Sequence, residues 1–148
     1  MQESDRDPSD RARRIARAFI EAIPHGRALG MSVVDIGEGR AVIEMPYDTR
    51  LIGDPETGII HGGAVSALMD TCGGAAVMAH PSGPVATATL DLRIDYMRGA
   101  TPGAPILAEA LCYHVTRTVA FVRAEARQAG EDGLVAAASG AFTLERAP

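Results

Sequence analysis

A single carboxylate, Asp70, lies within the apolar stretch His61 to Met78. If this stretch forms a helix, almost every face of that helix is apolar, which predicts that protein surrounds it on nearly every side. A carboxylate in such a place costs free energy unless it is hydrogen-bonded, solvated or used in chemistry. Asp70 is therefore either a structural group, which caps a loop or pairs with an arginine, or a catalytic one.

Two glycines at the predicted start of this helix, Gly62 and Gly63, offer a second kind of chemistry. The first N–H groups of a helix lack intrahelical acceptors, so a carbonyl oxygen or an oxyanion can bind them. His61 comes directly before the glycines. It could act as a general acid, but a histidine at this place is better explained as a group that positions the turn.

The spacing of these groups indicates a dimer. Gly62 and Asp70 are eight residues apart, or about 12 Å along a helix, so one small reacting group cannot touch both. If both serve one active site, the carboxylate must come from a second copy of the chain. Gly62, Ser66, Asp70 and Gly73 or Gly74 form a stripe of small or polar residues that would let two helices pass closely.

The residues from His61 to Asp70 read H-G-G-x-x-x-x-L-x-D, preceded by G-I-I. This motif resembles the signature of the PaaI-type hotdog-fold acyl-CoA thioesterases. The similarity extends from about Gly30 to the C-terminus and includes TATLDLRIDYMRGA and AAASGAFTL. It implies an α+β fold in which a curved antiparallel sheet wraps around one long helix. It also implies dimers that commonly pair into tetramers, and hydrolysis of the thioester of an acyl-CoA, with an aromatic or medium-chain acyl group as candidates.

The resemblance also suggests roles for single residues. The N–H of Gly62, with Gly63 beside it, would bind the thioester carbonyl, and Asp70 of the facing subunit would be the nucleophile or the base. Thr89 matches a serine or threonine that holds water near the acid. Related enzymes usually have an asparagine shortly before the His-Gly-Gly; the nearest match here is Asp54, which is either a second acid or a turn residue.

Cations are needed for the phosphates of CoA, and Arg98, Arg117 and Arg123 are the candidates, although surface arginines are often only solubilising. No metal site is expected, because the histidines share no ligand spacing with one another or with a cysteine pair. They are His25, His61, His80 and His114. No cofactor is expected.

Two other function classes remain open. A non-catalytic acyl-CoA binding or regulatory module would share the fold and the pocket. A hydratase or dehydratase acting on an acyl thioester is less favoured, because the chain lacks an Asp/His pair at the spacing those enzymes use.

The composition excludes several chemistries. The chain has a net charge of −5 and carries 14 basic residues, all arginine. Without lysine there can be no Walker A loop, Schiff-base enzyme or Ser-x-x-Lys hydrolase. Cys72 and Cys112 lack C-x-x-C spacing and indicate reduced core thiols in a cytoplasmic protein. No signal region or membrane-spanning stretch is visible.

The 148 residues suit one domain at 9–148, after a charged, mobile tail at 1–8. An amphipathic helix is predicted from Ser9, a possible N-cap, to Ile23, ended by Pro24 and Gly26. Acidic residues lie among its arginines, which favours a solvent-exposed face over nucleic-acid binding.

A loop is predicted at 47–57, between the second predicted strand and the central helix. A single helix can cover all the predicted strands only if the sheet curls around it. These strands are 31–36, 41–45, 86–96, 106–116, 118–128 and 134–144.

Overall fold

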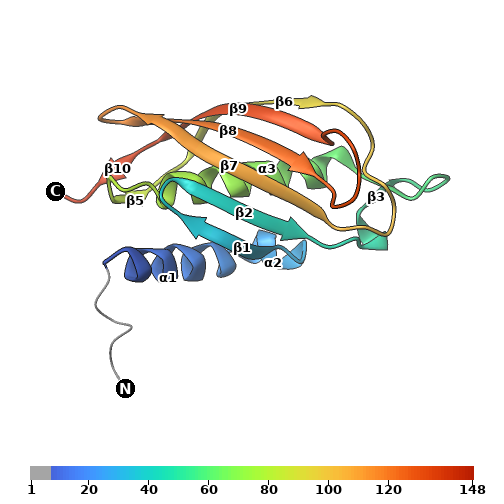
Figure 1. Ribbon diagram of the computed structural model, residues 1–148, viewed down its shortest axis with the longest axis horizontal. Coiled ribbons are helices and arrows are strands. Elements are labelled where there is room, and N and C mark those ends of the chain that lie inside the picture. Colours follow the sequence, from blue (N-terminus) through green and yellow to red (C-terminus); the bar gives the residue numbers. More distant parts are fainter. Residues whose placement is uncertain (1–7) are drawn as a thin grey trace, which may run out of the picture.

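The computed structural model describes residues 8–148, without the side chains of Pro8, Ser9 and Ala12. A six-stranded antiparallel sheet, in the order β1-β2-β7-β8-β9-β6, curves around the long helix α3 (Figure 1). This is the predicted hotdog architecture. The elements are α1 (Pro8–Glu21), α2 (Pro24–Ala28), β1 (Ser32–Gly37), β2 (Arg40–Met45), η1 (Thr49–Leu51), β3 (Ile52–Asp54), β4 (Ile59–Ile60), α3 (Gly62–Met78), β5 (Pro84–Ala86), β6 (Thr89–Tyr96), β7 (Ile106–Val115), β8 (Val119–Arg127), β9 (Ala136–Thr143) and β10 (Glu145–Arg146).

Small residues on the inner face of the sheet let α3 lie close to it. Strands β7 and β8 alternate, so that Ala108, Ala110 and Ala124 are buried against the helix while Glu109 and Arg123 are exposed on the outer face. This alternation is what a half-buried strand requires. The core therefore lies between one helix and the concave face of the sheet.

One glycine of the predicted small stripe has a packing role instead. A Cβ on Gly73 would lie 2.8 Å from Cζ of Phe142, a fully buried ring of β9. Gly74 is half-buried, and its nearest neighbour would be Thr87 Cγ2 at 3.9 Å. The open stripe therefore continues through Gly74, while Gly73 faces the sheet.

The N-terminal segment differs in part from the prediction. α1 begins at Pro8, one residue inside the predicted tail, and Pro24 begins the short helix α2 instead of only ending α1. Proline suits the first position of a helix because its missing N–H would have no acceptor there. The predicted mobility of residues 1–7 and the capping role of the Ser9 side chain lie outside the described residues.

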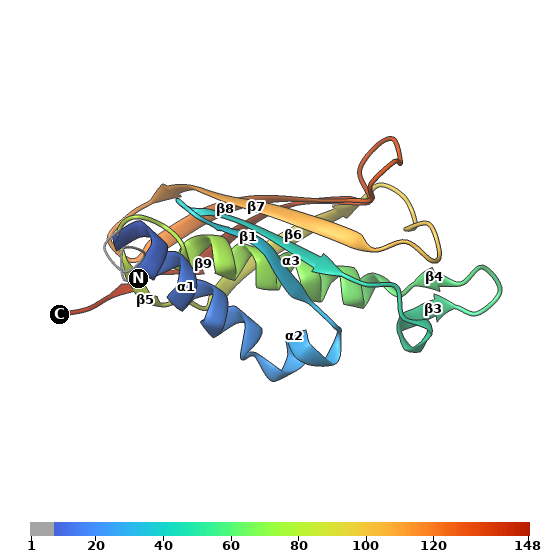
Figure 2. The same ribbon diagram turned by 60° about the horizontal axis from the view of Figure 1, so that its bottom comes forward.

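The predicted loop at 47–57 is also more regular than expected. β3 and β4 pair as a small antiparallel hairpin, preceded by the 3-10 turn η1. The hairpin projects beyond the start of α3, away from the main sheet (Figure 2). Short strands of this kind carry little hydrophobic periodicity, so the sequence pattern does not show them.

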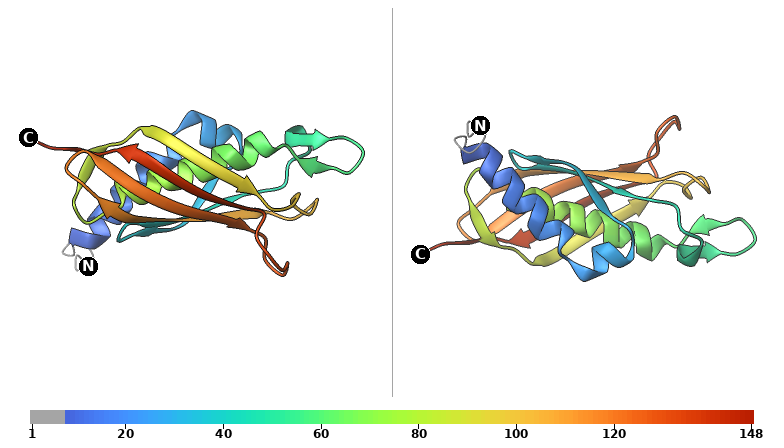
Figure 3. Two further views of the ribbon diagram at one scale, coloured as in Figure 1. Left: turned by 90° about the horizontal axis from the view of Figure 1, so that it is seen from above. Right: turned by 90° about the horizontal axis from the view of Figure 1, so that it is seen from below.

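The predicted strand at 86–96 is divided in two. β5 pairs with β10, and β6 begins only at Thr89, as the outermost strand of the main sheet next to β9. Figure 3 shows β6 at this edge, with α3 lying across the sheet's inner face and α1 beyond it. One side of β6 is therefore free to pair with another strand.

No helix within residues 8–148 combines the length and the hydropathy that a membrane crossing requires.

Candidate active site

Asp70 is half-buried and hydrogen-bonded to the edge strand. The hydroxyl Oγ1 of Thr89 donates to Oδ1 of Asp70 over 2.6 Å. Among the residues that the structure describes, no arginine forms an ion pair with Asp70. The carboxylate is thus neither sealed in the core nor paired with an arginine. Thr89 contacts the acid directly, and its expected role in holding a water near the acid stays a prediction.

The first turn of α3 leaves one N–H group available. The Gly63 N–H donates to Nδ1 of His61 over 2.8 Å, and the Ala64 N–H donates to the carbonyl oxygen of His61 over 3.0 Å. Within residues 8–148, the exposed N–H of Gly62 has no acceptor. Of the two predicted glycines, Gly62 can therefore bind a carbonyl oxygen through its N–H, while the N–H of Gly63 is used inside the chain.

His61 is the N-cap of the helix. Because its Nδ1 accepts a hydrogen bond, the proton of the neutral ring must be on Nε2. This hydrogen bond fixes the orientation of the ring beside Gly62, and the positioning role that the sequence favoured over a general acid stays a prediction.

Sequence analysis missed Tyr96. Its hydroxyl donates to the carbonyl oxygen of Gly62 over 2.9 Å and also contacts Oγ of Ser66. Strict alternation would place Tyr96 and Thr89, seven residues apart, on opposite faces of the strand. A bulge between Thr89 and Asp91 inserts one residue, and both side chains consequently reach α3.

Asp54 is a turn residue in this structure. Its Oδ2 accepts from the Thr57 hydroxyl over 2.6 Å and its Oδ1 accepts from the Glu56 N–H over 3.1 Å. The hydrogen bond from Thr57, followed by that from Glu56, lowers the pKa of Asp54. Both oxygens are occupied within the β3–β4 hairpin, which is the turn alternative of the two that the sequence left open.

The three candidate arginines lie in different places. Arg98 is half-buried and lines a cavity of about 370 Å³ together with Gly62 and Tyr96. Its Nη1 donates to Gly99 and Gln128, whereas Nε and Nη2 are buried without a partner.

Arg117 and Arg123 are far from that cavity. Arg117 lies in the β7–β8 turn, where its carbonyl oxygen accepts from Arg146. Arg123 lies on the outer face of the sheet, with its guanidinium 4.3 Å from the centre of the Tyr113 ring. Arg98 is thus the one of the three that the fold places beside the start of α3.

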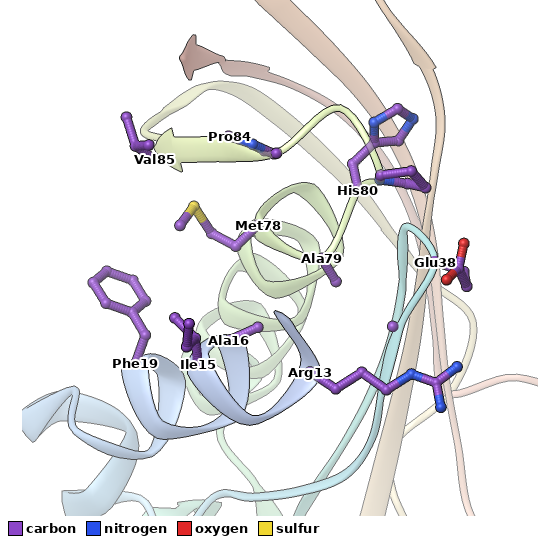
Figure 4. A pocket seen from close by; sticks show the side chains of 13 residues that line it. Arg13, Ile15, Ala16, Phe19, Glu38, Met78, Ala79, His80, Pro84 and Val85 are labelled. Carbon is purple, nitrogen blue, oxygen red and sulfur yellow. The ribbon is translucent and has the colours of Figure 1, made fainter. Parts of the chain in front are cut away.

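A larger cavity, of about 590 Å³, lies at the opposite end of α3 (Figure 4). Ile15 and Phe19 of α1, Met78 of α3 and Val85 of β5 form its walls. The N–H of Gly62 and the carboxylate of Asp70 do not line this cavity, which is mainly apolar and has Arg13, Glu38 and His80 as its titratable side chains.

In the part of the chain that the structure describes, no side chains are arranged for metal binding, and the cysteines are poorly suited to thiol chemistry. No three His, Cys, Asp or Glu side chains among these residues are placed to hold a metal ion. Cys72 and Cys112 are unpaired and buried, and burial raises the pKa of the Cys72 thiol to about 12. A thiolate nucleophile is therefore disfavoured at Cys72.

Comparison with known proteins places this geometry in a family. The family model of the thioesterase superfamily matches residues 57–135. A Halobacterium salinarum protein that carries an esterase name is 34% identical over 116 residues, covering 75% of this chain and 74% of that protein. A crystal structure of a Pseudomonas aeruginosa protein is 38% identical, with a TM-score of 0.78, and covers 89% of this chain and 98% of that one.

Proteins named PaaI are also among the structural neighbours. A mutant of the phenylacetic acid degradation protein PaaI from Thermus thermophilus is 30% identical, with a TM-score of 0.71 over 81% of this chain and 97% of that one. The Escherichia coli PaaI protein shares the fold, with a TM-score of 0.82 at 24% identity over 95% of this chain and 97% of that one. The chain therefore belongs to the thioesterase superfamily, within its PaaI-like hotdog-fold branch.

Proposed function

We propose that this protein hydrolyses acyl-CoA thioesters as a homodimer whose active sites lie between subunits. Membership of the thioesterase superfamily supports thioester hydrolysis in general. The observation that carries the proposal further is that β6 holds Thr89 against Asp70 and Tyr96 against Gly62. One edge strand thus supports both the acid and the N–H donor.

The chemistry would divide between two subunits. The Gly62 N–H of one subunit, with the positive end of the helix dipole behind it, draws negative charge onto the thioester carbonyl oxygen. Asp70 of the other subunit attacks the carbonyl carbon or removes a proton from an attacking water. In both cases the C–S bond breaks, the CoA thiolate leaves and takes up a proton, and the free acid is released. Thr89 orients the carboxylate or the water.

Pairing of two β6 edges would bring these groups together. In an antiparallel pair of β6 strands, the end that carries Tyr96 lies beside the start that carries Thr89 of the second copy. Because Tyr96 contacts Gly62 and Thr89 contacts Asp70, the same pairing brings the Gly62 of one copy toward the Asp70 of the other. The separation of about 12 Å between Gly62 and Asp70 within one chain is then no obstacle, because the two groups of one active site come from different subunits.

Charge complementarity favours two registers of that pairing. With Leu92 opposite Leu92 of the second copy, Asp91 lies opposite Arg93 on the outer face, twice per dimer, and such cross-strand pairs are favourable. With Ile94 opposite Ile94, Arg93 would lie opposite Asp95, which is equally favourable, whereas the register between the two would place Arg93 opposite Arg93. The outer side of β6 therefore carries a self-complementary pattern, and such dimers could pair again into tetramers.

Substrate and location follow as parts of the proposal. Arg98 is the preferred candidate for a CoA phosphate, because it is the one of the three arginines that lines the cavity beside Gly62. Arg117 and Arg123 would serve only if another subunit brought CoA to them. An aromatic or a medium-chain acyl group is proposed, and a cytoplasmic location agrees with two unpaired cysteines.

The direct test is thiol release from a panel of short, long and aromatic acyl-CoAs. Asp70→Asn should lower kcat by about 100- to 10,000-fold with little change in KM, because the amide can neither attack nor accept the proton. Asp132→Asn, which changes an exposed carboxylate in the β8–β9 turn, is the matched control and should keep full activity. An Asp70→Asn variant with most of its turnover would exclude Asp70 from the chemistry. Tight acyl-CoA binding by the wild type without thiol release would identify a binding module instead.

The dimer has its own test. Arg93→Asp should weaken self-association in sedimentation experiments, because it places Asp opposite Asp91 or Asp95 of the second copy. Restoration by Asp91→Arg in the same chain would identify the Leu92 register, and restoration by Asp95→Arg the Ile94 register. A monomeric wild type with full activity would refute the shared active site.

A further inference from the structure

The hydroxyls of Tyr96 and Ser66 form a directed chain of hydrogen bonds that ends on the first turn of α3. A carbonyl oxygen can only accept, so the single proton of the Tyr96 hydroxyl must point to the Gly62 oxygen, 2.9 Å away. The contact between Tyr96 and Ser66 then requires the serine hydroxyl to donate to the tyrosine oxygen. Chained hydrogen bonds of this kind strengthen one another by polarisation.

The Tyr96 ring also packs on the glycine itself. A Cβ on Gly62 would be 3.6 Å from Cε1 of the Tyr96 ring, which is ordinary contact distance. From the other side, the His61 ring holds the Gly63 N–H. The first turn of α3 is thus held on both sides, and Gly62 N–H is the one donor of that turn left without an acceptor among the described residues.

We infer that Tyr96 is a positioning residue, which holds the first turn of α3, and with it the Gly62 N–H, through the carbonyl oxygen of Gly62. The inference rests on the proposed function, in which that N–H binds the thioester carbonyl. Tyr96 is half exposed, and a tyrosine needed only for packing would not require its hydroxyl on the helix backbone. Its contribution should appear where charge develops on the carbonyl oxygen, and hence in kcat more than in KM.

The experiment compares Tyr96→Phe with Tyr113→Phe. Tyr113 has a similar exposed fraction, 45% against 49% for Tyr96, but lies on the outer face of the sheet under Arg123. Tyr96→Phe keeps the ring and removes the hydrogen bond, so kcat should fall about 5- to 10-fold with KM within about twofold. Amide hydrogen exchange at residues 62–66 should accelerate in the same variant. Tyr113→Phe should change neither quantity.

Ser66→Ala sharpens the test, because it leaves the bond from Tyr96 to Gly62 in place. A loss of less than about twofold in kcat is expected for it. A loss as large as that of Tyr96→Phe would contradict the proton direction derived above. An unchanged kcat together with unchanged exchange in Tyr96→Phe would overturn the positioning role. If the wild type released no thiol, the proposed function would fail, and hydrogen exchange alone would still decide whether Tyr96 fixes the turn.

Discussion

The glycines at the start of α3 and Gly73 in its second half have opposite surroundings. Gly62 and Gly63 at the start of the helix are exposed and are surrounded by polar contacts from His61 and Tyr96. Gly73 in the second half is buried, and the space that a side chain would need is occupied by Phe142. Glycine therefore leaves room for a ligand at the start of the helix and allows close packing against the sheet in its second half.

This difference separates the helix into two functional halves. The half from Gly62 to Asp70 carries the polar side-chain contacts to β6, and its exposed face can meet a substrate or a second subunit. The half from Thr71 to Met78 is fixed by the sheet. Substitutions on the exposed face of the first half should consequently affect turnover, while those at buried positions of the second should affect stability.

After Asp70→Asn, Gly62→Ala should have the largest effect on activity. The new methyl group fits beside the Tyr96 ring without a clash, so the free energy of unfolding should stay the same or rise. The methyl group restricts the approach of the thioester carbonyl to the N–H, and a misplacement of this kind can cost about 100-fold in kcat/KM. Thiol-release kinetics and a thermal melt of one sample measure both. A fully active Gly62→Ala would remove the glycine from the site.

Thr89→Val should lower kcat about tenfold. Valine keeps the branched shape on β6 but cannot donate to Asp70, and hydrogen bonds to charged groups contribute about 1.5–3 kcal/mol. Thr89→Ser, which keeps the hydroxyl, is the matched control and should retain most of the activity. If the serine variant lost as much as the valine variant, the methyl group of Thr89 and not its hydroxyl would be the important part.

Gly73→Ala should destabilise the fold by about 1–3 kcal/mol, because the added Cβ would overlap Phe142 in a packed core. Gly74→Ala, where the nearest neighbour is 3.9 Å away, is the control and should be close to neutral. Urea unfolding gives both values. The folded fraction of Gly73→Ala should turn over substrate normally, and a stable but inactive Gly73→Ala would contradict the division of α3 into two halves.

The smallest expected effect is a pH dependence in the buried half. Burial raises the pKa of Cys72 from 9.0 to about 12, so the folded chain keeps a proton that the unfolded chain loses above pH 9. The stabilisation is complete below pH 9 and is lost as the pH rises toward 12, by about 1 kcal/mol at pH 10. Cys72→Ser should not show this loss. Urea unfolding at pH 8 and pH 10 tests it, and equal losses in both proteins would refute it.

Local patterns predicted the parts of the site that lie within one segment. The apolar run, the two glycines and the lone carboxylate placed α3, its open N-terminus and Asp70 correctly, because helical period and backbone freedom are properties of neighbouring residues. The β3–β4 hairpin and α2 were missed, because elements of about two to five residues carry too little periodicity. The roles of Arg98, Arg117 and Arg123 remain predictions, since exposed cations depend on what the fold brings near them.

The sequence by itself determined which helix is buried, where its free N–H groups lie and which carboxylate interrupts it. Only the tertiary structure decided that Thr89 meets Asp70 across 19 residues and that Tyr96 meets Gly62 across 34. It also decided that Gly73 packs on the sheet while Gly74 stays open. The physical reason is that one inserted residue in a strand reverses the faces of its side chains, and a hydrophobic pattern does not show where pairing between distant segments places that residue.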